Sequence, residues 1–202
     1  MEEISLSANY HHTKYFNGDI QTFDNVFTDI QLNEITQEVS SLNYGYGSID
    51  DTTSIQNLQP AGMVNVGDGT SYWFTTLLDF CQKNMPEVKD IDVGRNHINL
   101  FGPRENARYH EDSPDGWTVL LYSNRYWDIN EAGETKFILP VDLMNNEAIQ
   151  SDTTDYPVIL SIAPIPGRLV LFKGDLYHTA TGFRSAWRFT PTIQFFNTGD
   201  QK

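Results

Sequence analysis

Short apolar runs dominate the second half of the chain. They follow one another after residue 91, and each is bounded by Gly, Pro, Asn or Asp. Short strands that recur at regular intervals between turn residues are typical of an antiparallel sandwich or barrel. The pattern therefore predicts about eight strands in this region. The runs are HINLFG, WTVLLYSNRYW, TKFILP, PVILSIAP, RLVLF and WRFTPTIQFF.

The stretch TDIQLNEITQEVSSLNYG has the pattern of an amphipathic helix. Ile35 and Val39 recur at helical spacing, so one face is apolar. Thr28 or Asp29 can cap the start of the helix, and Gly45 lies just past a plausible end. We predict a helix that packs on the sheet.

A second helical pattern begins at SYWFTTLLDFCQKNMPEV. Trp73, Leu77, Leu78 and Cys81 fall on one face, which we expect to be buried, and Pro86 marks the end. Two helices followed by many strands predict a mainly β fold with supporting helices.

The remaining segments complete a single domain, residues 1–202. Residues 1–90 are expected to form a helical buttress with lead-in strands, one of them at IQTFDNVF, and residues 91–197 the β core. The long polar stretch 43–70 is predicted to be a loop, and a substrate lid there is a hypothesis that rests on its length and polarity.

Charge and cysteine content narrow the classes of function. The net charge of −14, from 27 acidic and 13 basic residues, argues against a nucleic-acid partner, which would need clustered Lys and Arg. Cys81, the single cysteine, cannot form an internal disulfide and fits a reducing compartment. The sequence shows neither a secretory signal nor an apolar segment that could span a bilayer. We expect a cytoplasmic protein with no membrane partner.

Candidate chemistry begins at the sequence RYHEDSPDGW. His110 and Asp112 are two residues apart, and on an extended segment this spacing directs both side chains to the same side. A third ligand, His178, follows the strand RLVLF after the turn KGD. Two imidazoles and one carboxylate on one face of a divalent iron leave three positions open for cosubstrate and oxygen. The alternative for His110 alone is a surface histidine, and for His178 a residue that closes a strand.

Three other residues compete for the metal. His97 is more simply a strand residue. Glu111 alternates to the opposite face of an extended segment, and Asp115 lies beyond Pro114 in a predicted turn. Asp112 is therefore the preferred carboxylate.

The last apolar run places an arginine on the inner face of the predicted barrel. Arg188 shares a face with Thr190, and an unpaired buried charge is costly. A dicarboxylate ligand would satisfy it through a two-pronged contact, although pairing with an acidic residue of the chain is an alternative. Arg184 lies in a predicted turn and is the rival arginine. Tyr122, in VLLYSN, can add a phenol from a neighbouring strand or serve simply as a strand aromatic.

Taken together, these motifs resemble the iron(II)- and 2-oxoglutarate-dependent oxygenases, and most closely their prolyl 4-hydroxylase-like branch. The matching stretches are YHED, TVLLYSN, EAGETKF, PGRLVLF with YHTATGF, and WRFTPTIQF, across about residues 96–196. The resemblance implies a double-stranded β-helix, a cupin-like jelly roll. It also implies that His110, Asp112 and His178 bind Fe(II).

The same resemblance assigns the cosubstrate site. Arg188 would bind the distal carboxylate of 2-oxoglutarate, aided by Tyr122 and Thr190. AGET resembles the glycine–glycine turn of the family, with Ala132 in place of the first glycine. Collagen-type enzymes carry Lys where this chain has Arg188, which weakens the case for a collagen-like substrate.

The function implied is hydroxylation of an unactivated C–H bond. Fe(II), 2-oxoglutarate and O2 would be required, with ascorbate as an optional addition, and succinate and CO2 would be released. Peptidyl proline, another peptide or a small molecule is the expected substrate. The alternative is a cupin-like module that binds a metal or a sugar without oxidation.

Overall fold

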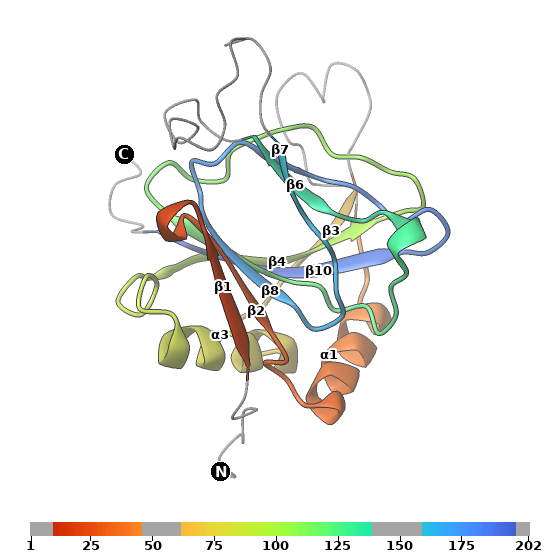
Figure 1. The fold of residues 1–202 in the computed structure, drawn as a ribbon. Coiled ribbons are helices and arrows are strands. Elements are labelled where there is room, and N and C mark those ends of the chain that lie inside the picture. Colours follow the sequence, from red (N-terminus) through yellow and green to blue (C-terminus); the bar gives the residue numbers. More distant parts are fainter. Residues whose placement is uncertain (1–9, 46–61, 139–158, 197–202) are drawn as a thin grey trace, which may run out of the picture.

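The computed structural model describes residues 10–45, 62–138 and 159–196, which form two antiparallel sheets that face each other (Figure 1). The larger sheet has seven strands in the order β1-β2-β8-β5-β10-β4-β3, and the smaller has three in the order β7-β6-β9. This arrangement confirms the predicted jelly roll. The strands are β1 (His11–Tyr15), β2 (Ile20–Asp24), β3 (Met63–Val66), β4 (Val93–Phe101), β5 (Trp117–Leu121), β6 (Thr135–Ile138), β7 (Ile159–Ile162), β8 (Leu169–Lys173), β9 (His178–Ala180) and β10 (Arg188–Phe195).

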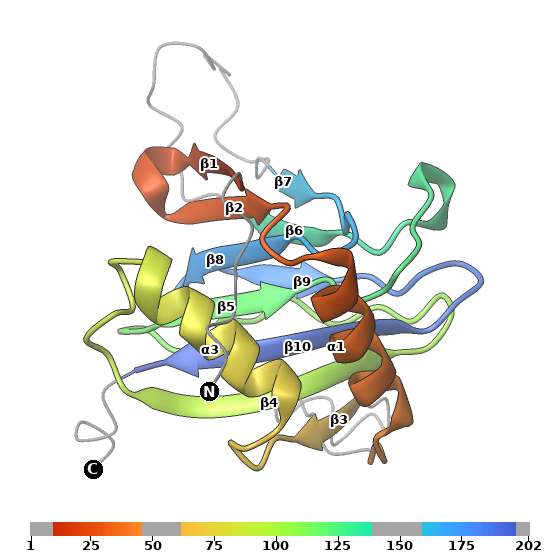
Figure 2. The ribbon, with the colours of Figure 1, turned by 90° about the horizontal axis from the view of Figure 1, so that it is seen from below.

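Two helices, α1 (Asp29–Ser41) and α3 (Tyr72–Asn84), cover the outer face of the larger sheet (Figure 2). Thr28 begins α1 with a capping box, in which its hydroxyl accepts from the N–H of Gln31 and the Gln31 side chain accepts from the N–H of Thr28. Neither helix is long and apolar enough to cross a membrane, and the same holds throughout the described residues. Short 3-10 turns lie at Phe16–Gly18 and Ile129–Glu131.

The larger sheet is buried on both faces, which gives two apolar cores. One core lies between the sheet and the helices, where Ile35, Val39 and Trp73 pack against alternate strand residues such as Leu171. The other lies between the two sheets and includes Phe172. Because both faces are covered, β8 is apolar at successive positions instead of alternating.

The described residues correct one expectation about local structure. β3 lies within the stretch 43–70, which was predicted to be a loop throughout; Val64 pairs with Gly45 and β3 with β4, and this edge pairing stabilises a strand too short to stand out among polar residues. Residues 46–61, which make up most of the hypothetical lid, lie outside the described residues. The three-residue β9 begins at His178, which was expected to come from a strand that neighbours the segment of His110.

Candidate active site

A backbone pairing brings two of the predicted metal ligands together. His110 and His178 form an isolated antiparallel bridge, in which each N–H donates to the other residue's carbonyl at 2.9 Å. Residues directly opposite each other in such a pair direct their side chains to the same face. The two imidazole rings consequently lie with their centroids 4.5 Å apart.

Hydrogen bonds to the main chain fix the tautomer of both rings. Nδ1 of His110 lies 2.9 Å from the carbonyl of Arg108, and Nδ1 of His178 lies 2.8 Å from that of Leu176. A carbonyl oxygen only accepts, so both Nδ1 atoms carry the proton. The two Nε2 atoms therefore keep their lone pairs, as metal ligation requires.

Asp112 is held in place by its backbone and by its side chain. Its N–H donates to the carbonyl of Gly174 at 2.9 Å, and a Cβ at Gly174 would collide with the backbone of Ser113. The turn after β8 can approach this closely because residue 174 is glycine. The hydroxyl of Thr118 on β5 donates to Oδ2 of Asp112 at 2.6 Å.

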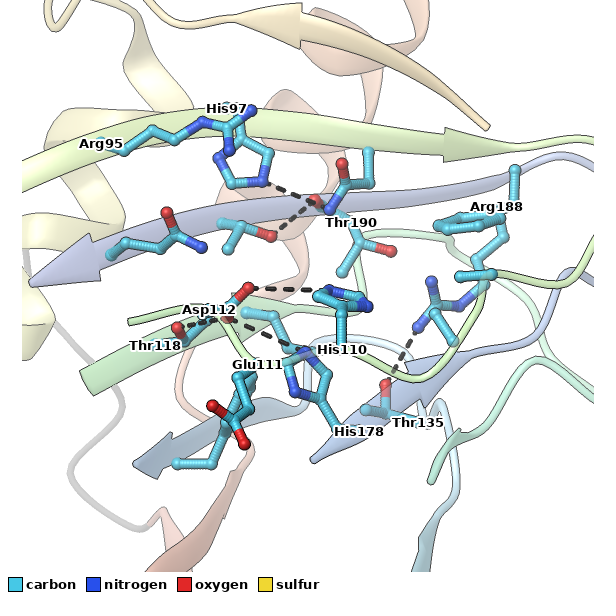
Figure 3. A pocket seen from close by; sticks show the side chains of 18 residues that line it. Arg95, His97, His110, Glu111, Asp112, Thr118, Thr135, His178, Arg188 and Thr190 are labelled. Atoms are coloured by element: carbon cyan, nitrogen blue, oxygen red, sulfur yellow. Dashed lines mark hydrogen bonds and ion pairs between the residues drawn. The ribbon is translucent and has the colours of Figure 1, made fainter. Parts of the chain in front are cut away.

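The three side chains converge on one point (Figure 3). Their ligand atoms lie within 4.8 Å of one another, with Nε2 of His110 3.7 Å and Nε2 of His178 3.8 Å from the Asp112 carboxylate. A His2Asp donor set with both Nε2 atoms unprotonated fits Fe(II). Of the rival residues, Asp115 is exposed, whereas Glu111 and His97 line the same cavity but lie outside this cluster.

Arg188 lies on the inner face of β10, at the other side of the cavity (Figure 3). It is only 1% exposed, and its Nε donates to the carbonyl of Gly133 at 2.9 Å. No acidic side chain in the described parts of the chain forms an ion pair with it. Burial lowers the pKa of Arg188, but a guanidinium starts so high that it stays charged. A buried cation without a counter-charge fits an anionic ligand. Arg184, its rival, is exposed.

Thr135 joins Arg188 to Tyr122 and was missed by the sequence analysis. Its hydroxyl accepts from Tyr122 at 2.7 Å and from Nη2 of Arg188 at 3.2 Å. The ring of Tyr122 also lies beside the guanidinium, 5.2 Å from its Cζ atom. Tyr122, expected to assist Arg188 at the carboxylate of 2-oxoglutarate, donates its hydroxyl to Thr135 and lies beside the guanidinium. Thr135 is the final residue of the AGET motif, which could have pointed to it.

The AGET turn has two successive residues at positive φ, Ala132 and Gly133. Ala132 adopts φ 62° and ψ −140°, a conformation that favours glycine, so the turn carries backbone strain. Gly133, at φ 92°, has no room for a Cβ because the ring of Phe183 occupies that space. The turn presents the Gly133 carbonyl to Arg188.

The cavity itself measures about 180 Å³ and lies between the two sheets. Thr190, predicted to assist Arg188, lines it, and its buried hydroxyl has no hydrogen-bond partner in the part of the chain that the structure describes. Three further lining residues were not singled out as a group: His97, Asn99 and Gln194. The sequence could have pointed to them because side chains two positions apart on a strand share a face: His97 and Asn99 on β4, and Gln194 with Thr192 on β10.

The jelly roll thus encloses a His–Asp–His cluster and a buried arginine in one cavity. Solved structures of prolyl hydroxylases and of a member of the 2OG-Fe(II) oxygenase family have a similar fold. Neither a protein-family model nor a curated protein sequence matches the chain.

Three structures illustrate the match. A prolyl-4-hydroxylase from Pseudomonas putida is 16% identical, covers 94% of this chain and 93% of its own, and gives a TM-score of 0.55. A prolyl hydroxylase from Trichoplax adhaerens, in complex with a hypoxia-inducible-factor peptide, is 16% identical over 95% of this chain and 84% of its own, with a TM-score of 0.60. HygX from Streptomyces hygroscopicus, with nickel and 2-oxoglutarate bound, is 10% identical over 90% and 84%, with a TM-score of 0.65. At these identities the likeness establishes the fold, and the fold is the one that the sequence resemblance implied.

Proposed function

We propose that the protein is an Fe(II)- and 2-oxoglutarate-dependent dioxygenase that hydroxylates an unactivated C–H bond. The observation that carries the proposal is Arg188, a buried cation without a carboxylate partner among the described residues, which lines the same cavity as the His–Asp–His cluster. A protein that only stored a metal would have no need of a desolvated guanidinium inside its barrel.

In this proposal His110, Asp112 and His178 would hold the iron, and Arg188 would bind the distal carboxylate of 2-oxoglutarate. When bound, iron and cosubstrate would supply the oxidising chemistry, in which O2, 2-oxoglutarate and R–H give R–OH, succinate and CO2. Thr118 keeps one carboxylate oxygen of Asp112 engaged and so orients the other.

The remaining residues position the cosubstrate and exclude water. The free hydroxyl of Thr190 can donate to the carboxylate that Arg188 binds, and Thr135 and Tyr122 hold the guanidinium in place. Phe172 packs against the ring of His178 with centroids 4.7 Å apart, which closes the metal side of the cavity with an apolar wall.

The substrate class rests on charge and on the similar structures. A net charge of −14 disfavours nucleic acid. The similar structures hold a peptide in one case and, in a second HygX structure, hygromycin B. Peptidyl proline, other peptides and small molecules are therefore the first substrates to test. The fully buried Cys81 suits a reducing compartment, and we place the protein in the cytoplasm.

Anaerobic binding of Fe(II) and 2-oxoglutarate tests the proposal directly. The complex should show a weak visible charge-transfer band, and on exposure to air 2-oxoglutarate should be converted to succinate. His178→Ala should lose both, whereas His11→Ala, an exposed histidine on β1, should keep both. A wild-type protein that binds iron but not 2-oxoglutarate would instead support the non-oxidative cupin-like module.

A further inference from the structure

The paired strands β4 and β10 each direct a row of mostly polar side chains into the cavity. β4 and β10 pair so that Phe101 lies opposite Arg188 at one end and Arg95 lies opposite Gln194 at the other. All four residues line the cavity, and Figure 3 shows Arg95 and Arg188 at its two ends. The cavity therefore has a second cationic end.

The second end remains open when the proposed cosubstrate is in place. Residues 188 and 194 are six positions apart, which is about 20 Å along a strand at roughly 3.3 Å per residue. A five-carbon dicarboxylate anchored at Arg188 is much shorter than this. Thr118, the partner of Asp112, pairs with Gln194, so the metal cluster lies near the Arg95 end.

Arg95 has the chemistry of an anion receptor. It is exposed at the edge of the cavity, and it makes no hydrogen bond or ion pair with any described residue. A guanidinium presents a planar, two-pronged set of donors that matches a carboxylate. The chain as a whole is strongly acidic, so a cation without an acidic partner at this position stands out.

His97, on the inner face of the same strand, adds a second, independent observation. It is only 4% exposed, and no described residue forms a hydrogen bond with its Nδ1. The amide nitrogen of Asn99 donates to Nε2 at 3.3 Å, so the ring proton lies on Nδ1. Burial and the nearby charge of Arg95 lower the pKa of His97 to about 3, which keeps the ring neutral. A buried N–H without an acceptor fits a ligand oxygen.

We propose that this end of the cavity binds a carboxylate of the substrate to be oxidised, with Arg95 as its ionic anchor and His97 as a hydrogen-bond donor. The inference rests on the proposed oxygenase function and narrows its substrate to molecules that carry a free carboxylate. A free amino acid and the C-terminus of a peptide both carry such a carboxylate.

Equilibrium binding tests this inference without turnover. The anaerobic protein is saturated with Fe(II) and 2-oxoglutarate, so that Arg188 is occupied. It is then titrated with free amino acids, N-acetyl amino acids and tripeptides, each as the acid and as its C-terminal amide. Calorimetry and a shift of the visible band report binding. Acids should bind at least 10-fold more tightly than their amides, and the arm that binds identifies the source of the carboxylate.

Substitutions at position 95 separate charge from shape. Arg95→Gln should remove the preference for acids while 2-oxoglutarate affinity stays unchanged, and Arg95→Lys should retain part of it. Arg104→Gln, an exposed arginine that does not line the cavity, is the matched control and should behave as wild type. Equal binding of acids and amides, an unchanged preference in Arg95→Gln, or no binding by any member of the panel would overturn the inference. Failure of 2-oxoglutarate itself to bind would instead overturn the proposed function.

Discussion

β8 and β10 lie in the same sheet and are equally buried, yet their inward residues differ completely in chemistry. Residues 169–172 of β8 are apolar and 0% exposed. The inward row of β10 is polar and between 1% and 7% exposed: Arg188, Thr190, Thr192 and Gln194. Burial of the inner face of β8 therefore removes no polar side chain from water, whereas burial of the inward row of β10 desolvates a polar side chain at every position.

This difference separates scaffold from site within one sheet. The β5–β8 half joins the two sheets through the inter-sheet apolar core, and most of its inward residues serve packing. The β4–β10 half faces the cavity, where polar groups such as the Thr190 hydroxyl lack partners within the described residues. Buried polar groups that stay unsatisfied in the protein alone indicate that a ligand satisfies them.

Replacing Arg188 by methionine would make β10 resemble β8 and should give the largest effect. We expect the affinity for 2-oxoglutarate to fall about 100-fold, or roughly 3 kcal/mol, because the charge-assisted contact is lost. The free energy of unfolding should change by only about 1 kcal/mol, since no carboxylate is left unpaired. Calorimetry with Mn(II)-loaded protein and urea unfolding measure the two quantities.

The matched control is Arg184→Met, at an exposed arginine close in sequence. It should leave both quantities unchanged. If Arg188→Met unfolds the protein, the arginine is structural; if it binds 2-oxoglutarate normally, the carboxylate does not reach position 188.

The same contrast explains how much could be predicted from the sequence. The continuous apolar run of β8 and the alternation in β10 are local patterns, so both strands and the inward row that contains Arg188 were predictable. β9 has three residues and depends on β6 and on the bridge to His110, which no local pattern encodes. The hydrogen bonds of Thr118 with Asp112 and of Thr135 with Arg188 depend on the tertiary fold, and threonine is common in any strand.

His97 belongs to the polar half and should make stability depend on pH. Its pKa is about 3 in the folded protein, chiefly because burial disfavours the charged ring. In the unfolded chain a histidine titrates near 6.5. Between these values the unfolded chain binds a proton that the folded chain does not, so stability falls as the pH falls below about 6.5. At pH 4.5 the loss should be about 2 to 3 kcal/mol relative to pH 7.

Urea unfolding of the metal-free protein at pH 7 and pH 4.5 measures this loss. Carboxylates also titrate in this range, so the informative quantity is the difference between wild type and His97→Gln, which lacks the ring. The variant should lose about 2 to 3 kcal/mol less on acidification. His11→Gln, at an exposed position, should match wild type. An identical pH dependence in His97→Gln would show that folding does not lower the pKa of this ring.

The smallest effects should come from single substitutions that exchange valine and threonine, which have nearly the same shape, between the apolar strand β8 and the polar row of β10. Val170→Thr places a hydroxyl in the apolar core between the sheets and should cost about 1 to 3 kcal/mol, because the side chain is 0% exposed. Thr190→Val removes a hydroxyl that has no partner among the described residues, so stability should stay within about 1 kcal/mol of wild type or rise. The same change should weaken 2-oxoglutarate binding a few-fold, since the hydroxyl is proposed to donate to its carboxylate. Thermal unfolding and calorimetry on the two variants give the comparison. Equal losses of stability would mean that Thr190 is satisfied within the protein, and that the polar row has a structural role there.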